Sequence, residues 1–89
     1  MPSEELLESW ERTRGHLARA WAELPPGAGD TGEYQEYLDH NELGLAVKAL
    51  ADVGVLRGAS TPFWTALADA AREMKLTGQA EEYQRRSEG

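Results

Sequence analysis

Apolar residues separated by three, four or seven positions run through the first quarter of the chain. At about 100 degrees per residue they fall within about 60 degrees of one another. These residues are Leu6, Trp10, Leu17, Trp21 and Leu24. Ser3 is of a type that begins helices, and the sequence from Pro25 to Gly27 ends any helix before it. The pattern therefore predicts one long amphipathic helix over residues 3–24.

The rest of the chain predicts more helices and no strand. No stretch alternates between apolar and polar residues, and no hairpin turn or internal repeat is found. After a loop at 25–32, we expect helices at about 33–39, 42–53, 62–75 and 79–86. Residues 1–89 are too few for two independent cores and contain no cysteine. They are predicted to form one all-α domain, a small bundle of four to five helices.

Cap residues set the expected limits of these helices. Asp30 and Glu33 have the spacing of a capping box before the second helix. Asn41 and Thr61 are of types that begin helices, so they are expected to cap the third and fourth. Gly54 is expected to end the third helix, because glycine is the usual residue just beyond a C-terminus.

The third predicted helix is apolar on two sides. Leu43, Val47 and Leu50 share one face with Ala46, whereas Leu45 points roughly the other way. A helix of this kind usually lies at the centre of its bundle, so we expect Leu45 in the core. The alternative is an exposed Leu45 that contacts a partner.

The formal net charge is −7, and it lies entirely in the first half of the chain. Residues 1–42 hold ten Asp or Glu and three Arg, whereas residues 43–89 hold six acids and six bases. Such a surface repels phosphate backbones and attracts a basic protein partner, so nucleic acid is not an expected ligand. With no run approaching the roughly 20 apolar residues of a membrane span and no signal-peptide pattern at the start, we expect no membrane association and a cytoplasmic location.

Catalysis and metal binding are not expected. His40 lies beside Asp39 and near Glu42, but three or four ligands would have to converge and the sequence has no such spacing. The acids lie among hydrophilic residues, and Ser60 and Thr61 are better explained as caps than as nucleophiles. We therefore expect a protein that is not an enzyme and that has no cofactor and no metal.

The strongest candidate for function is the second predicted helix and the turn after it. This segment combines carboxylates with tyrosines, a side chain typical of binding hot spots. The predicted partner-binding residues are Glu33, Tyr34, Glu36, Tyr37, Asp39, His40 and Glu42. The alternative is that both tyrosines cover the core and the acids form only a solvated face.

One segment resembles a known family. Residues 37–46, with the sequence YLDHNELGLA, followed by Leu50, resemble the MafI-type immunity proteins of bacterial toxin–immunity systems. A weaker similarity covers residues 74–76. The resemblance extends over about half of the chain, and it implies a small cytoplasmic helical protein that binds and neutralises a cognate toxin, often a nuclease.

Other functions remain open. One alternative is a helical adaptor or homodimerising module that uses Trp64, which lies at the margin of its helix, together with Leu45. Another is a helix–turn–helix DNA-binding protein. Its recognition helix would carry Arg72 beside Asp69 and Glu73, an arrangement poorly suited to a DNA groove. A small enzyme or metal protein would depend on His40 and its acidic neighbours alone.

Overall fold

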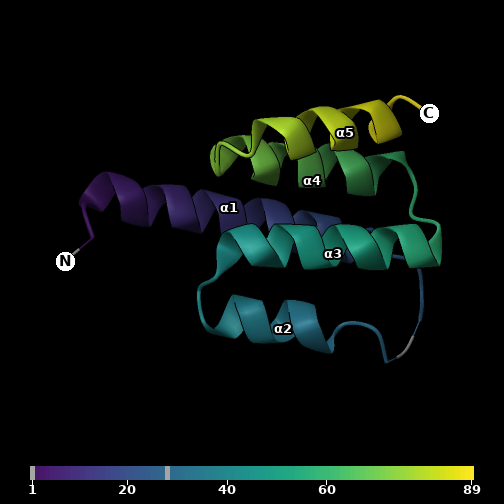
Figure 1. The fold of residues 1–89 in the computed structure, drawn as a ribbon, viewed down its shortest axis with the longest axis horizontal. Helices are drawn as coiled ribbons and strands as arrows, with labels where there is room; N and C mark the ends of the chain where they lie inside the picture. Colours follow the sequence, from purple (N-terminus) through teal and green to yellow (C-terminus); the bar gives the residue numbers. More distant parts are fainter. Residues whose placement is uncertain (1, 28) are drawn as a thin grey trace.

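The structure, a computed structural model, describes residues 2–27 and 29–89. Within these residues the chain forms five α-helices and no strand. They are α1 (Glu4–Ala22), α2 (Gly32–Asp39), α3 (Leu43–Arg57), α4 (Thr61–Glu73) and α5 (Thr77–Ser87). α1 and α3 overlap in the middle of the molecule, α2 lies along one side of them, and α4 and α5 lie along the other (Figure 1). The predicted all-α bundle is confirmed. None of these helices is long and apolar enough to cross a membrane.

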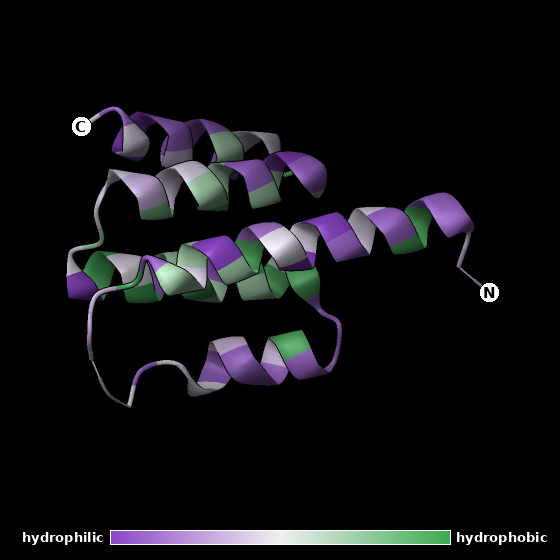
Figure 2. Cartoon of the chain, turned by 180° about the vertical axis from the view of Figure 1, so that it is seen from behind, coloured by the Kyte–Doolittle hydropathy of each residue, from purple (hydrophilic) through white to green (hydrophobic). Residues whose placement is uncertain are grey.

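α1 begins where it was predicted, and its N-terminal turns are only partly covered by the other helices. The side-chain oxygen of Ser3 accepts a hydrogen bond of 3.1 Å from the backbone N–H of Leu6, and Glu4 occupies the first turn. Leu17 is fully buried, but Leu6 is 42% exposed. The N-terminal turns project beyond the other helices, as the view from behind also shows (Figure 2). The apolar face predicted for α1 is only partly covered because its N-terminal turns extend beyond the other helices.

α3 is the central helix, as its two apolar sides predict. It packs against α1, α2 and α4, and Leu43, Val47 and Leu50 are buried. The expectation for Leu45 is wrong, because this side chain is 48% exposed. Three neighbouring helices cover three sides of α3, and Leu45 lies on the side that remains in solvent.

The end of α3 lies four residues later than predicted. Gly58, at φ 63°, forms the left-handed C-cap, and the N–H of Ala59 donates to the carbonyl of Gly54 over 2.9 Å. Gly54 is a buried residue within the helix, where a Cβ would overlap the Phe63 ring. This glycine therefore serves close packing of α3 on α4, and its prediction as a helix end is wrong.

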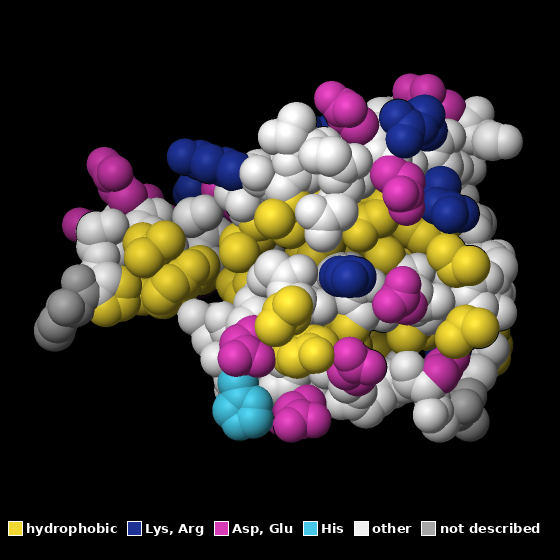
Figure 3. Space-filling model, in the orientation of Figure 1, with side chains coloured by type: hydrophobic (Ala, Val, Ile, Leu, Met, Phe, Trp, Pro, Cys, Tyr) yellow, Lys and Arg dark blue, Asp and Glu magenta, His cyan; other side chains and the backbone are white. Residues whose placement is uncertain are grey.

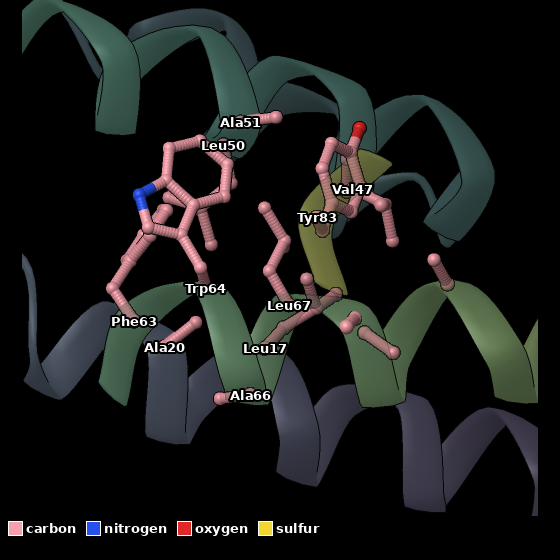
Figure 4. Close-up of a cluster of buried hydrophobic side chains, with 14 of the residues drawn as sticks. Leu17, Ala20, Val47, Leu50, Ala51, Phe63, Trp64, Ala66, Leu67 and Tyr83 are labelled. Atoms are coloured by element: carbon pink, nitrogen blue, oxygen red, sulfur yellow. The ribbon is translucent and has the colours of Figure 1, made fainter. Parts of the chain in front are cut away.

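The core lies between α1, α3 and α4 and is closed by α5. Phe63 and Leu67 of α4 are fully buried, and Tyr83 of α5 is 3% exposed (Figure 4). Trp64, predicted at the margin, is only 4% exposed. Its ring packs edge-on to Phe63 and 5.7 Å from Tyr83, and its indole N–H donates to the carbonyl of Ala59. The proposed homodimer contact through Trp64 is therefore ruled out by burial.

The starts of α4 and α5 also differ from the prediction. α4 has Ser60 at its N-cap, and Thr61, predicted as the cap, is already helical. α5 begins at Thr77, two residues earlier than expected, because the chain reverses before it at Lys75, which has φ 61°. The break was predicted between residues 75 and 79, but it lies at residues 74–76, and residue types did not show which residue adopts the left-handed conformation.

Candidate functional site

The solvent-facing side of α2 carries most of the residues predicted to bind a partner. At about 100 degrees per residue, Glu36 lies opposite the core-facing side of the helix, with the other polar members on either flank. The exposed members are Glu33, Glu36, Asp39 and His40 of α2 and its C-cap, and Glu42 at the N-cap of α3. We call these five residues, with the half-buried Tyr37, the acidic surface. Acidic side chains and a histidine gather over α2 at the lower edge of the space-filling view (Figure 3).

The two tyrosines of α2 have different surroundings. Tyr34 is 3% exposed and stacks on Trp21 of α1, with ring centroids 5.4 Å apart and an interplanar angle of 17°. Burial raises the pKa of the Tyr34 hydroxyl. Tyr34 therefore supports the acidic surface from below and is not presented on it, and its contact with a partner stays a prediction.

Tyr37 lies at the edge of the acidic surface. Its hydroxyl donates a hydrogen bond of 3.1 Å to the carboxylate of Glu33, one turn earlier on the helix. This bond, the charge of Glu33, burial and the nearby charges of Glu42 and Glu36 together raise the pKa of Tyr37. The phenol thus remains a proton donor surrounded by acceptors, and part of its ring is open to solvent.

The C-terminal end of α2 is fixed by backbone and side-chain hydrogen bonds. Asn41 adopts a left-handed conformation at φ 56°, and the N–H of Glu42 donates to the carbonyl of Tyr37 over 2.8 Å. The guanidinium of Arg14, from α1, donates to the carbonyl of Leu38 over 2.8 Å and to the side-chain oxygen of Asn41 over 3.0 Å. Asn41 therefore ends α2, whereas it was predicted to begin the next helix.

An ion pair holds the loop that leads into α2. The guanidinium of Arg57, at the end of α3, contacts both carboxylate oxygens of Asp30 and donates to the carbonyl of Pro25 over 2.9 Å. The hydrogen bond from Arg57 lowers the pKa of Asp30. Because Asp30 makes this contact, the predicted capping box with Glu33 does not form, and Thr31 at the N-cap makes no side-chain cap.

The basic residues near α2 leave its acids without ionic partners. Arg12 pairs with Glu73 of α4, with N–O 2.8 Å apart, and Arg19 lies 3.3 Å from Asp69 of the same helix. Arg14 caps α2 through uncharged oxygens. Within the described part of the chain, no ion pair includes a carboxylate of the acidic surface. The charge excess of the first half is therefore directed to solvent here.

A hollow lies beside the acidic surface, between α1 and α2. Its volume is about 290 Å³, and it is lined by Arg14, Ala18, Trp21, Tyr34, Gln35 and Leu38. Trp21 is 38% exposed, so part of its indole remains available at this wall. A concave, partly aromatic recess next to exposed charge is a typical place for an anchoring side chain of a binding partner.

Sequence reasoning missed Trp21 and Arg14 as parts of this site. Both lie on α1, far from α2 in the sequence, and Trp21 was assigned to the apolar face of α1. The only available signal was the position of Trp21 one turn before the end of an amphipathic helix, which does not say which neighbour it meets.

The site has the chemistry of a recognition surface. Across residues 2–27 and 29–89, no three His, Cys, Asp or Glu side chains are placed to hold a metal ion. His40 is exposed at the C-cap of α2. The carboxylates can accept hydrogen bonds and salt bridges from cationic side chains, and the adjacent hollow has room for a side chain.

The chain matches no protein-family model, and neither a curated protein nor a solved structure matches it significantly. The resemblance to MafI-type immunity proteins therefore stays a prediction.

Proposed function

We propose that this chain is a non-catalytic inhibitory binding protein of the immunity type, which acts in the cytoplasm and neutralises a toxin domain with a basic surface. The observation that carries the proposal is that Glu36, Asp39 and Glu42 are exposed on one rigidly held helix and its turn and have no ionic partner in the described residues. A surface that needed only solubility would mix both signs of charge.

Rigid support makes this surface suitable for binding. α2 has only eight residues, too few to be stable alone, so it depends on Trp21, Arg14 and the pair Asp30–Arg57 for its position. A helix that is already ordered in the free protein loses less conformational entropy on binding. The tertiary contacts around α2 thus favour tight recognition over a merely solvated face.

The chemistry of the partner follows from charge. A nuclease holds phosphates with Lys and Arg, and an acidic protein can occupy that surface and block substrate. The resemblance of residues 37–46 to MafI-type proteins agrees with a partner of this kind. The hollow between α1 and α2 would take an apolar or arginine side chain at the rim of the contact.

The proposal predicts that a secreted protein with a basic C-terminal domain is encoded immediately upstream of this chain, and that domain is the partner used in the test. The domain is mixed with the wild-type chain and with the triple variant Glu36→Lys, Asp39→Lys, Glu42→Lys, and association is followed by stopped-flow fluorescence at low salt. We expect association of the triple variant to be slower by at least about tenfold, because reversal removes steering and adds repulsion.

A second triple variant, Glu8→Lys, Glu11→Lys, Glu23→Lys, provides the matched control. It changes the net charge by the same amount at exposed residues of α1 and its C-cap. If both triple variants slow association equally, overall charge and not the acidic surface is responsible. If the wild-type chain does not bind that domain or relieve its toxicity, the proposed function is wrong.

A further inference from the structure

The side of α3 that no other helix covers carries an ordered row of side chains. Leu45 is 48% exposed, Val55 53% and Leu56 74%. Lys48 and Asp52 lie between them and are also exposed. In the space-filling view, apolar side chains run across the middle of the molecule, over α3, and are interrupted there by one basic and one acidic group (Figure 3). We call these five residues the α3 stripe.

The spacing of the α3 stripe is that of two helices packed side by side. Positions 45, 48, 52 and 55 follow one another at intervals of three, four and three residues, the pattern of the a and d positions of a coiled coil. The outer two of these positions are apolar, and the inner two are Lys48 and Asp52. No helix of the described chain covers this row.

The stripe is also symmetric about its own centre. Leu45 and Val55 lie five residues before and after position 50, and Lys48 and Asp52 lie two residues before and after it. When two copies of such a helix pack antiparallel about a two-fold axis at position 50, Leu45 lies at the level of Val55 of the second copy. In the same arrangement, Lys48 lies at the level of Asp52 of the second copy. Leu45 thus meets Val55 and Lys48 meets Asp52, whereas Leu56, at the end of the stripe, lies at the level of Gly44 of the second copy.

The charges of the stripe are available for this pairing. No ion pair of residues 2–27 or 29–89 includes Lys48 or Asp52. The two are four residues apart with the base first, which is the less favourable order for a pair within one helix. A second copy would supply two such pairs at the centre of the contact, flanked at both ends by leucine and valine.

We propose that the chain forms an antiparallel, two-fold symmetric homodimer through the α3 stripe. One helix face is small beside the roughly 1,200–2,000 Å² that stable complexes bury, so dimer and monomer exchange and their ratio depends on concentration. The two-fold axis runs across α3, and α2 of both copies therefore lies on the same side of the dimer. This inference does not depend on a toxin partner.

Sedimentation equilibrium over a range of concentrations tests the dimer. The wild-type chain is expected to shift from monomer to dimer as its concentration rises into the millimolar range. Lys48→Glu and Asp52→Lys each place like charges at the centre, and each is expected to weaken the dimer at least about tenfold. Leu56→Ser is expected to weaken it as well, without affecting the fold, because this side chain is 74% exposed.

Mixing the two charge variants separates this contact from any other. Lys48→Glu carries two acids in the stripe and Asp52→Lys carries two bases, so each alone is expected to dimerise at least about tenfold more weakly than the wild type, and their mixture is expected to form a heterodimer. The double variant Lys48→Glu, Asp52→Lys is expected to dimerise like the wild type, since the charges are only exchanged. Arg85→Glu, an exposed reversal on α5, is the control and should leave the dimer unchanged.

Three results would overturn the proposal. The first is a wild-type chain that stays monomeric at every concentration. The second is a mixture of the two folded charge variants that forms no heterodimer. The third is an equal effect of Arg85→Glu, which would place the contact elsewhere or make it a response to net charge alone.

Discussion

The two sides of α1 differ in how they treat charge. Toward α4, two carboxylates pair with arginines of α1: Glu73 with Arg12 and Asp69 with Arg19. Toward α2, the arginine of α1 binds backbone and amide oxygens, and the carboxylates of the acidic surface remain in solvent. On the α4 side, ion pairs join two helices, whereas the carboxylates of the acidic surface on α2 are exposed to solvent.

The two sides also differ in their aromatic anchors. Trp64 fixes α4 and α5 from inside the core, and the guanidinium of Arg86 lies 5.0 Å from its ring centre. Trp21 fixes α2 from a half-open position at the surface. The α4–α5 side is therefore anchored by a buried tryptophan, whereas the α2 side is anchored by one that is partly in solvent.

The largest effect that separates the two sides is expected from their tryptophans. Trp64→Ala should lower the free energy of unfolding by about 3–5 kcal/mol, because it leaves a cavity next to Phe63 and Tyr83. Trp21→Ala should lower it by only about 1–2 kcal/mol, because part of that ring is already hydrated. Urea unfolding followed by circular dichroism measures both.

Hydrogen exchange shows which helices lose stability in each of the two tryptophan variants. Trp21→Ala is expected to accelerate exchange of the α2 amides and to leave α4 and α5 protected. Equal losses of stability in the two variants, or exchange that accelerates evenly over the chain, would contradict the distinction between a buried anchor of α4 and α5 and a partly exposed anchor of α2.

The second effect concerns pH. Hydrogen bonds from Arg12 and Ser9 lower the pKa of Glu73 from 4.5 to about 2. A carboxyl whose pKa is lower in the folded state adds stability above its unfolded pKa and loses it as the pH falls toward the folded value. Glu73→Gln should therefore cost about 1 kcal/mol at pH 7, and the difference from wild type should shrink between about pH 4.5 and 2.

Asp30→Asn is the matching change on the α2 side, where Arg57 lowers the pKa of the carboxyl. Its stability difference from the wild type should also shrink as the pH falls below the unfolded pKa of Asp30. Unfolding curves at a series of pH values give both differences. A difference for Glu73→Gln that stays constant from pH 7 to pH 2 would show that the ion pair of α1 and α4 adds no pH-dependent stability.

The sequence predicted the helices well because their signals are local. Apolar spacing in residues 3–24 and 42–53, and the prolines after Leu24, depend on neighbours a few positions away. The predictions that failed concern residues whose role depends on contacts between helices. The sequence predicts Gly54 as the end of a helix. In the fold it is a position where the Phe63 ring packs against α3 and leaves no room for a Cβ, and this contact cannot be found from the sequence alone.

The candidate site was predictable in composition but not in construction. Exposed acids on residues 33–42 follow from their type, whereas the choice between Tyr34 and Tyr37 depends on which side of α2 faces α1. Leu45 is a different case. Lys48 and Asp52 share its side of α3, and these two charges were the signal in the sequence that this side faces solvent.

The smallest effect compares the left-handed residues that end α2 and α4. Lys75 has φ 61°, a conformation that costs a side chain with a Cβ, so Lys75→Gly should stabilise the fold by roughly 0.5–1 kcal/mol. Asn41 has φ 56° but is better tolerated there, and its side chain also accepts a hydrogen bond from Arg14. Asn41→Gly should therefore give no gain or a slight loss, since relief of strain is offset by the lost bond. Thermal unfolding of the two variants at pH 7 makes the comparison. A gain for Asn41→Gly as large as that for Lys75→Gly would mean that Arg14 does not stabilise the end of α2, and the acidic surface would then be less rigid than its contacts indicate.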